Sequence, residues 1–368
     1  MHLSDRDVPA PCQTPRVRIV YSSFDGSYSD TPRAVHRRLT GCGSLDHVWL
    51  AGRQQADSFP ADVDTVPMDS DEAVAALESA DLVIANSHIE LEWVKGPVTT
   101  YLQTWHGTPL KRIHHDVLWA PEGRLDRLDR DVARWDLLIS PNAVSTPRLR
   151  GAFRFEKEVL EIGYPRNDVL SAPDLEKRQA AVRQRLGIDP GATVVLYAPT
   201  WRDDEAFQAG SPTVPLALDL EALSAALGPD HVLLARLHPL MSGRSHIPSS
   251  RALRDVSAHP DVSELYAAAD VLVTDYSSSM FDFAITGRPM VFFTYDLEHF
   301  RDSVRGFYFD FLPEAPGPLV STADELAEVL LAPPDFSDRY AAFREKYCHL
   351  EDGHATDRLL DRLGLEAG

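Results

Sequence analysis

The sequence has 368 residues, and its 36 Lys and Arg against 56 Asp and Glu give a net charge of −20 at pH 7. Such a chain exceeds what one hydrophobic core usually serves, so we expect two domains. The acidity argues against nucleic-acid binding and against more than peripheral contact with an anionic membrane.

The cysteines and the apolar runs indicate where in the cell the protein is expected. Cys12, Cys42 and Cys348 lie far apart, without the spacing of a zinc site. No uninterrupted apolar run approaches the ~18 residues of a membrane span, and the polar N-terminus is not typical of a signal peptide. We therefore expect a cytoplasmic protein, at most peripheral at the inner face of the plasma membrane.

Short apolar runs that end in turn residues and lead into helical patterns recur along the chain, as in βα units around parallel sheets. In the first half the predicted strands are 17–23, 46–52, 81–87, 99–106 and 136–142. A polar helical stretch at 171–186 follows and predicts the interdomain connection. In the second half the predicted strands are 193–200, 231–239, 269–277 and 288–296. The pattern predicts an α/β protein with Rossmann-like domains at 15–170 and 187–332, and a helical tail at 335–365 that packs back on the first domain.

The first candidate site is QTWHGTPLKRI, at 103–113. A β-rich run ends at His106 and Gly107, and Thr108 followed by proline is typical of a helix start. His106 should therefore lie at the carboxyl end of a strand, where open α/β sheets bind ligands. A neutral imidazole there can take a proton from an attacking hydroxyl, a contribution of about 10²–10⁴-fold. An isolated histidine more often bonds a backbone carbonyl, but this context favours a base.

The second candidate site is DVLVTDYSSSMFDFAITGRP, at 270–289. A buried strand runs into Thr274, Asp275, Ser277 and Ser278 before an amphipathic helix. Free N–H groups, the helix dipole and the hydroxyls suit an anion such as a diphosphate. An ordinary serine-rich N-cap is the structural alternative.

Two further strand ends deliver cations to the same edge of the second domain. YAPTWRDD carries Thr200 and Arg202, and ARLHPL carries Arg236 and His238. Arginine suits bidentate contact with phosphate, and a donor histidine can neutralise a leaving phosphate. Surface salt bridging is an equally good explanation for each arginine alone.

The loop at 22–35 supplies Ser29, Asp30 and Arg33 after a glycine, as a βα loop near a ligand would, but it is a weak motif. P-loop, zincin and nucleophile-elbow motifs are absent from the sequence. The run KRIHHD at 111–116 is not expected to bind metal, because adjacent histidines on a helix point about 100° apart.

Seven segments in this order resemble the CDP-glycerol glycerophosphotransferases, a family that primes and polymerises teichoic acids, with relatives that build polyol-phosphate capsules. They are YSSFDGSYSDTPR, QTWHGTPLK, IGYPRND, YAPTWR, RLHP, DVLVTDYSSSMFDF and RGFYFDF. The resemblance implies a GT-B fold, with the acceptor handled by the first domain and the cytidine nucleotide by the second.

The resemblance also implies roles for individual residues. His106 would activate the acceptor hydroxyl, and the donor diphosphate would be held by Arg202, His238, Ser277 and Ser278. Thr274 and Asp275 would shape that loop, and Arg236 would assist. The other expected substrate-binding residues are Gly107, Thr108, Thr200, Ser29, Asp30 and Arg33.

The implied reaction is attack of a glycan or lipid-linked glycan hydroxyl on a CDP-polyol such as CDP-glycerol, with release of CMP. No cofactor is expected, and any Mg²⁺ would arrive with the donor diphosphate. Two alternatives stay open: a GT-B glycosyltransferase that uses a nucleotide sugar and releases a nucleoside diphosphate, and a noncatalytic scaffold that keeps the nucleotide fold.

Overall fold

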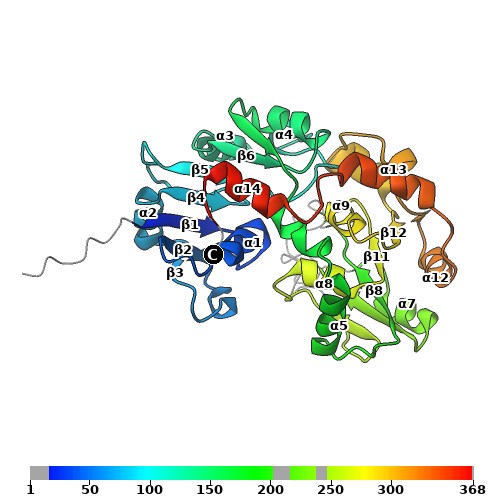
Figure 1. Ribbon diagram of the computed structural model, residues 1–368. Coiled ribbons are helices and arrows are strands. Elements are labelled where there is room, and N and C mark those ends of the chain that lie inside the picture. The colour runs from blue at the N-terminus through cyan, green and yellow to red at the C-terminus, as the bar shows by residue number, and fades with distance from the viewer. Residues whose placement is uncertain (1–15, 201, 203–215, 238–246, 367–368) are drawn as a thin grey trace, which may run out of the picture.

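A computed structural model describes residues 16–200, 202, 216–237 and 247–366. The described chain forms two parallel β-sheets, each flanked by helices, and they lie side by side (Figure 1). The expected α/β architecture with two Rossmann-like halves is thereby confirmed.

The first sheet has the strand order β3-β2-β1-β4-β5-β6-β7. Its strands are β1 (Val17–Ser22), β2 (Leu45–Ala51), β3 (Thr65–Pro67), β4 (Leu82–Ala85), β5 (Thr100–Gln103), β6 (Leu137–Ser140) and β7 (Glu158–Glu161). Side chains alternate between two apolar clusters, so that Val20 and Val83 pack on one face while Ile19 and Ile84 pack on the other. Both faces are buried, as expected for a parallel sheet covered by helices.

The second sheet has the order β10-β9-β8-β11-β12-β13. Its strands are β8 (Thr193–Tyr197), β9 (His231–Ala235), β10 (Leu253–Asp255), β11 (Val271–Thr274), β12 (Met290–Phe293) and β13 (Leu319–Val320). The same alternation holds, with Leu196 and Leu272 in one cluster and Val195 and Val273 in the other. The central strands were all predicted from the sequence because they are apolar on both faces.

The sequence did not predict β3, β7, β10 and β13, and each of these strands lies at an edge of its sheet. They are short and partly exposed, and β7 (EVLE) has only one buried residue. An edge strand pairs on one side only, so its side chains need not be apolar.

The α-helices are α1 (Asp30–Leu39), α2 (Asp71–Glu78), α3 (Arg124–Val132), α4 (Ser145–Phe153), α5 (Leu175–Arg185), α7 (Leu220–Leu227), α8 (Val262–Ala268), α9 (Ser279–Ala284), α10 (Leu297–His299), α11 (Phe311–Glu314), α12 (Ala323–Leu331), α13 (Ser337–Tyr347) and α14 (Ala355–Leu363). Short 3₁₀ turns cover η1 (Ala56–Ser58), η2 (His114–Asp116) and η3 (Pro165–Leu170), and η4 (Phe300–Val304) is a π turn. Every helix of the described part of the chain is too short or too polar to cross a bilayer.

The chain passes between the two sheets twice. After β7 and η3 it enters α5, which packs on α8 beside the second sheet. Helix α13 places Phe343 and Tyr347 against Phe281 of α9. Helix α14 then returns, and Leu359 and Leu360 join the apolar cluster of the first sheet (Figure 1).

Candidate active site

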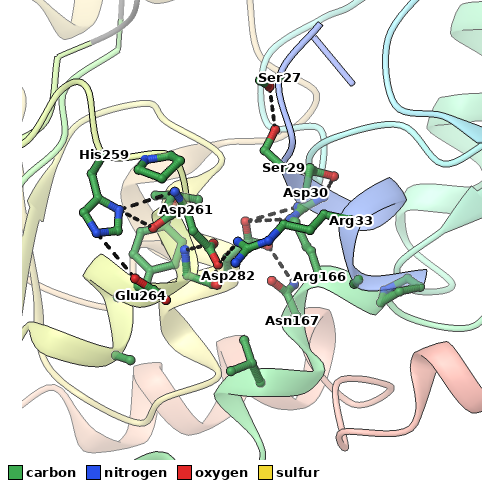
Figure 2. Close-up of a pocket in the computed structure, with 18 of the residues that line it drawn as sticks. Ser27, Ser29, Asp30, Arg33, Arg166, Asn167, His259, Asp261, Glu264 and Asp282 are labelled. Carbon is green, nitrogen blue, oxygen red and sulfur yellow. Dashed lines mark hydrogen bonds and ion pairs between the residues drawn. The ribbon is translucent and has the colours of Figure 1, made fainter. Parts of the chain in front are cut away.

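A cavity of about 1250 Å³ opens between the two halves, near the carboxyl ends of their strands. Its polar lining includes Ser29, Asp30, Arg33 and His106 from the first half, Arg166 and Asn167 from η3, and Arg236, His259, Asp261, Ser278 and Asp282 from the second half. Figure 2 labels Arg33, Arg166 and Asp282 among them. A ligand bound in this cavity would contact both halves. Open α/β sheets bind their ligands at the carboxyl ends of the strands, and pockets between domains are common binding sites.

His106 follows β5 and is held in a defined tautomer. Its Nδ1 lies 2.5 Å from the carbonyl oxygen of Asn86, which can only accept, so Nδ1 carries the proton and Nε2 has a free lone pair. The ring stacks on Trp105 at 4.2 Å between centroids. Burial lowers the pKa of His106, although the Asn86 bond opposes the effect. A neutral imidazole with a free Nε2 can act as a general base near pH 7.

The residue after His106 brings the two halves into contact. A Cβ placed on Gly107 would lie 2.7 Å from Oγ and 3.0 Å from Cβ of Ser278. No larger residue fits without a shift, so Gly107 sets how closely the first half approaches α9. The sequence predicted both residues as substrate-binding; Ser278 lines the cavity, and Gly107 lies directly behind it.

Arg166 lies at the junction of the halves and is buried. Its Nη2 donates to Asp282 Oδ1 at 3.0 Å, and its Nη1 lies 3.5 Å from Asp30 Oδ1 (Figure 2). Asn167 donates a further bond to Asp282 at 2.8 Å. One cation thus joins an aspartate at the start of α1 to an aspartate of α9, and this network forms part of the cavity wall.

Glu351 lies beside this network, in the loop between α13 and α14, and is buried. One carboxylate oxygen accepts from the backbone N–H of Tyr164 at 3.1 Å, and the other has no hydrogen-bond partner among the described residues. Burial, reinforced by Asp282, raises the pKa of Glu351 to about 8, while Arg166 opposes the rise. Glu351 is therefore largely protonated at neutral pH.

Arg33 and Asp261 form an ion pair across the cavity, from α1 to the start of α8. The hydroxyl of Ser29, at the N-terminus of α1, forms hydrogen bonds with the hydroxyls of Ser23 at 2.9 Å and Ser27 at 2.7 Å. Asp30 adopts a left-handed backbone with φ of 59°, and this conformation supports the turn that directs its carboxylate to Arg166. The weak loop motif of the sequence therefore lies in the cavity.

Arg236 is the cation best placed for an anionic ligand. It donates to the carbonyl of His259 at 2.6 Å, and among the described residues no carboxylate lies within ion-pair distance. Burial lowers the pKa of Arg236 below that of an ordinary arginine. Binding a phosphate would supply the countercharge that this guanidinium lacks.

Arg202, which the sequence predicted as a diphosphate ligand, has other partners. It bonds Asp275 at 2.9 Å and Asp296 at 2.6 Å, is 6% exposed and does not line the cavity. The backbone N–H of Thr200 also donates to Asp275, at 2.8 Å. In this conformation the charge of Arg202 is neutralised within the second half.

The other predicted residues of this region also bond within the protein. The Thr274 hydroxyl donates to the carbonyl of Ala198 at 2.7 Å, and the hydroxyls of Ser277 and Ser279 form a hydrogen bond of 2.9 Å. Thr108 is buried behind the cavity. Helix α9 is only six residues long, shorter than the predicted amphipathic helix. His238 lies outside the described residues.

Arg166, Asn167 and Asp282 were not among the predicted site residues. The first two belong to IGYPRND and the third to SSSMFDF, so all three lie within segments that carry the family resemblance. A buried arginine with two distant carboxylate partners leaves no local pattern in a sequence. The resemblance was thus the only signal that could have found them.

Two parallel sheets face one cavity, with a neutral histidine on one side and, among the described residues, an arginine without a carboxylate partner on the other. This arrangement is that of an α/β protein of the GT-B type. The model of the family described as CDP-Glycerol:Poly(glycerophosphate) glycerophosphotransferase matches residues 10–365. The chain belongs to this family, as its motifs predicted.

Similar proteins agree with this assignment. The chain is 38% identical over 363 residues to the teichoic acid poly(glycerol phosphate) polymerase of Bacillus subtilis (strain 168), covering 94% of this chain and 48% of that protein. It is 38% identical over 356 residues to the teichoic acid glycerol-phosphate transferase of Staphylococcus aureus (strain NCTC 8325 / PS 47), covering 93% and 91%. The chain thus spans about half the length of the Bacillus polymerase and most of the staphylococcal transferase.

The fold is also that of solved relatives. The structure of the wall teichoic acid polymerase TagF matches with a TM-score of 0.86 at 35% identity, covering 95% of this chain and 89% of that chain. The UDP-GlcNAc 2-epimerase from Neisseria meningitidis matches with a TM-score of 0.51 at 12% identity, covering 94% and 99%, and shares the fold alone.

Proposed function

We propose that the protein transfers a polyol phosphate, glycerol phosphate first among them, from a CDP-polyol to an acceptor hydroxyl and releases CMP. The observation that carries this proposal is His106, fixed by Asn86 with Nε2 free, in one cavity with Arg236. Family membership supports the donor, and the H444N variant of the similar polymerase TagF has been solved after a soak with CDPG.

In the proposed reaction the acceptor oxygen attacks the phosphorus that carries the polyol. The bond from that phosphorus to the bridging oxygen of CMP breaks, and the proton of the hydroxyl passes to Nε2 of His106. Arg236 would balance the charge of the donor phosphates, and positioning with charge stabilisation would supply most of the rate. A glycan or lipid-linked glycan is the proposed acceptor. The expectation that any Mg²⁺ comes with the donor stays a prediction.

The test is CMP release from CDP-glycerol and CDP-ribitol, with and without lipid-linked and soluble glycan acceptors. We expect acceptor-dependent CMP, and we expect His106→Gln to lower its rate by about 10²–10⁴-fold, the usual contribution of a general base. His349→Gln, at an exposed position outside the cavity, is the matched control and should keep the wild-type rate.

Two results would contradict the proposal. Release of a nucleoside diphosphate from a nucleotide sugar, with no CMP from either CDP-polyol, would identify a glycosyltransferase. Binding of a CDP-polyol without turnover on any acceptor would favour a noncatalytic scaffold. Full turnover by His106→Gln would remove His106 from the role of base while leaving the reaction itself in place.

A further inference from the structure

Three side chains outside the cavity converge at the surface of the first half. His114 and His115 of η2 and Asp129 of α3 each offer one ligand atom, and these atoms all lie within 4.8 Å of one another. Nε2 of His115 lies 2.9 Å from Asp129 Oδ1, and Nε2 of His114 lies 3.8 Å from the same oxygen. Two ligands about 2.1 Å from a tetrahedral metal ion are roughly 3.4 Å apart, so small side-chain movements would centre an ion.

The local backbone explains how adjacent histidines reach one point. On a regular α-helix their side chains would diverge by about 100°. His114 instead has a φ of 49° at the start of a 3₁₀ turn, and the two rings stand at 68° with centroids 4.7 Å apart. The prediction that this run cannot bind metal assumed a helix, and the structure contradicts that assumption.

His114 supplies an independent sign of a ligand. Its side chain is 2% exposed and packed between His88 and Phe153. The backbone of Ala152 lies near the ring, but neither ring nitrogen makes a well-formed hydrogen bond with a described residue. Leaving a buried polar group unsatisfied lowers stability, and a bound ligand would relieve that cost. An imidazole binds a divalent metal through the lone pair of a deprotonated ring nitrogen, so His114 can serve as one ligand.

We propose that His114, His115 and Asp129 bind one divalent transition-metal ion of the zinc class. Two imidazoles and one carboxylate are a common ligand set for Zn²⁺, and a water can complete the tetrahedron because the Asp129 side chain is 40% exposed. A hydrogen bond between His115 and Asp129 is the simpler explanation of that pair, but it leaves the buried nitrogens of His114 without a well-formed hydrogen bond among the described residues.

The position of the ion suggests its effect on the protein. It would join α3 to the segment that runs from Gly107 to η2. That segment also contacts the second half, because Arg112 N donates to the Gly306 carbonyl at 3.1 Å and Lys111 forms a β-bridge with Phe307. A bound ion would therefore stiffen the stretch that links the candidate base to the second half.

The test uses tag-free, chelator-treated protein, because a polyhistidine tag would itself bind the probe. Co²⁺ is titrated while the visible absorption of a tetrahedral site is recorded, and Zn²⁺ affinity is then measured by competition. We expect one ion per chain, and we expect Zn²⁺ to raise the melting temperature by mass action. His115→Gln and Asp129→Asn should each weaken binding by at least the ~10–100-fold typical of lost outer-sphere partners, and should abolish the thermal shift.

His114→Asn removes the buried ligand while keeping a residue that tolerates positive φ. His354→Gln is the matched control: it alters a histidine 3.3 Å from Asp357 without a third ligand, and should bind like the wild type. Circular dichroism verifies that each variant is folded. Absence of ion binding by the wild type, or unchanged binding by His115→Gln and Asp129→Asn, would overturn the proposal.

Discussion

Arg166 and Arg202 are both buried, both lie between two aspartates, and both pack on aromatic rings. The aspartates of Arg166 come from different halves of the chain, and Arg166 lines the cavity. The aspartates of Arg202 both belong to the second half, and its guanidinium is enclosed there. Burial and residue type therefore do not show whether an arginine lines the cavity. The two arginines differ in which domains supply their aspartate partners.

The sharpest test of this comparison is the pair Arg166→Met and Arg202→Met. Each change leaves two buried carboxylates without a cation, so each should lower the free energy of unfolding by about 3–5 kcal/mol in urea titrations. Only Arg166→Met should also lower CMP release per folded molecule, by about 10²–10³-fold, because a charge in the cavity wall is lost. Equal losses of turnover in the two variants would refute the distinction.

Glu351→Gln tests the carboxyl that lies beside Arg166. The pKa of Glu351 is about 8 in the folded protein against an ordinary 4.5, so the folded state holds the proton more tightly. This contribution to stability is complete below pH 4.5 and is lost as the pH rises through 8. We expect the variant to gain stability relative to the wild type across this window, by an amount on the order of a few kcal/mol.

The measurement is the free energy of unfolding of both proteins at several pH values between 4 and 9. Glu314→Gln, at a half-buried carboxyl paired with Lys346, is the control and should not show this trend. A constant difference between wild type and Glu351→Gln over the whole range would show that Glu351 is ionised in the folded protein.

Gly107→Ala tests how closely the halves must approach. The new Cβ would clash with Ser278, so we expect the domains to part slightly, at a cost of about 1–3 kcal/mol and with a higher KM for the donor. Adding Ser278→Gly removes both clashing atoms and should restore much of the loss. If the double variant is no better than Gly107→Ala alone, the contact does not set the domain spacing.

Arg33→Gln should have the smallest effect. The side chains of Arg33 and Asp261 are 17% and 18% exposed, and such a pair contributes about 1 kcal/mol or less. Raising the salt concentration should produce part of the effect of Arg33→Gln in the wild-type protein. Asp261→Asn should have the same effect as Arg33→Gln on the free energy of unfolding and on KM. A loss as large as that of Arg166→Met would mean that Arg33 contacts the substrate.

The interior of both sheets could be predicted from the sequence, because strands covered on both faces must be apolar throughout. The edge strands could not, since β7 pairs on one side and needs only Leu160 buried. His106 was placed near the end of β5 because the apolar run before it could be read from the sequence, and its role as base stays a prediction. The helix expected from Thr108 does not form, and the chain continues without a helix to η2. Arg166 and Asp282 were missed because 116 residues separate them, and only the folded chain brings them together.

The same reasoning applies to Arg202, whose predicted role as a diphosphate ligand stays a prediction. Arg202 follows a strand end and therefore resembled a ligand, but Asp296, which neutralises it, lies 94 residues further along. The histidine pair at 114–115 was not expected to bind metal because a helix was assumed there. The positive φ of His114 shows that the backbone is not a regular α-helix at this point. Local patterns locate the carboxyl ends of the central strands well, but they do not show which charges are already neutralised there.

The return of helix α14 to the first sheet affects the order in which the protein can fold during synthesis. Leu359 and Leu360 complete an apolar surface whose strands end at β7, long before α14 leaves the ribosome. Domains generally fold as units as they emerge. Until the second domain has been made, the apolar cluster of the first sheet lacks these two leucines, so the nascent chain depends on late, distant contacts that are slow to form.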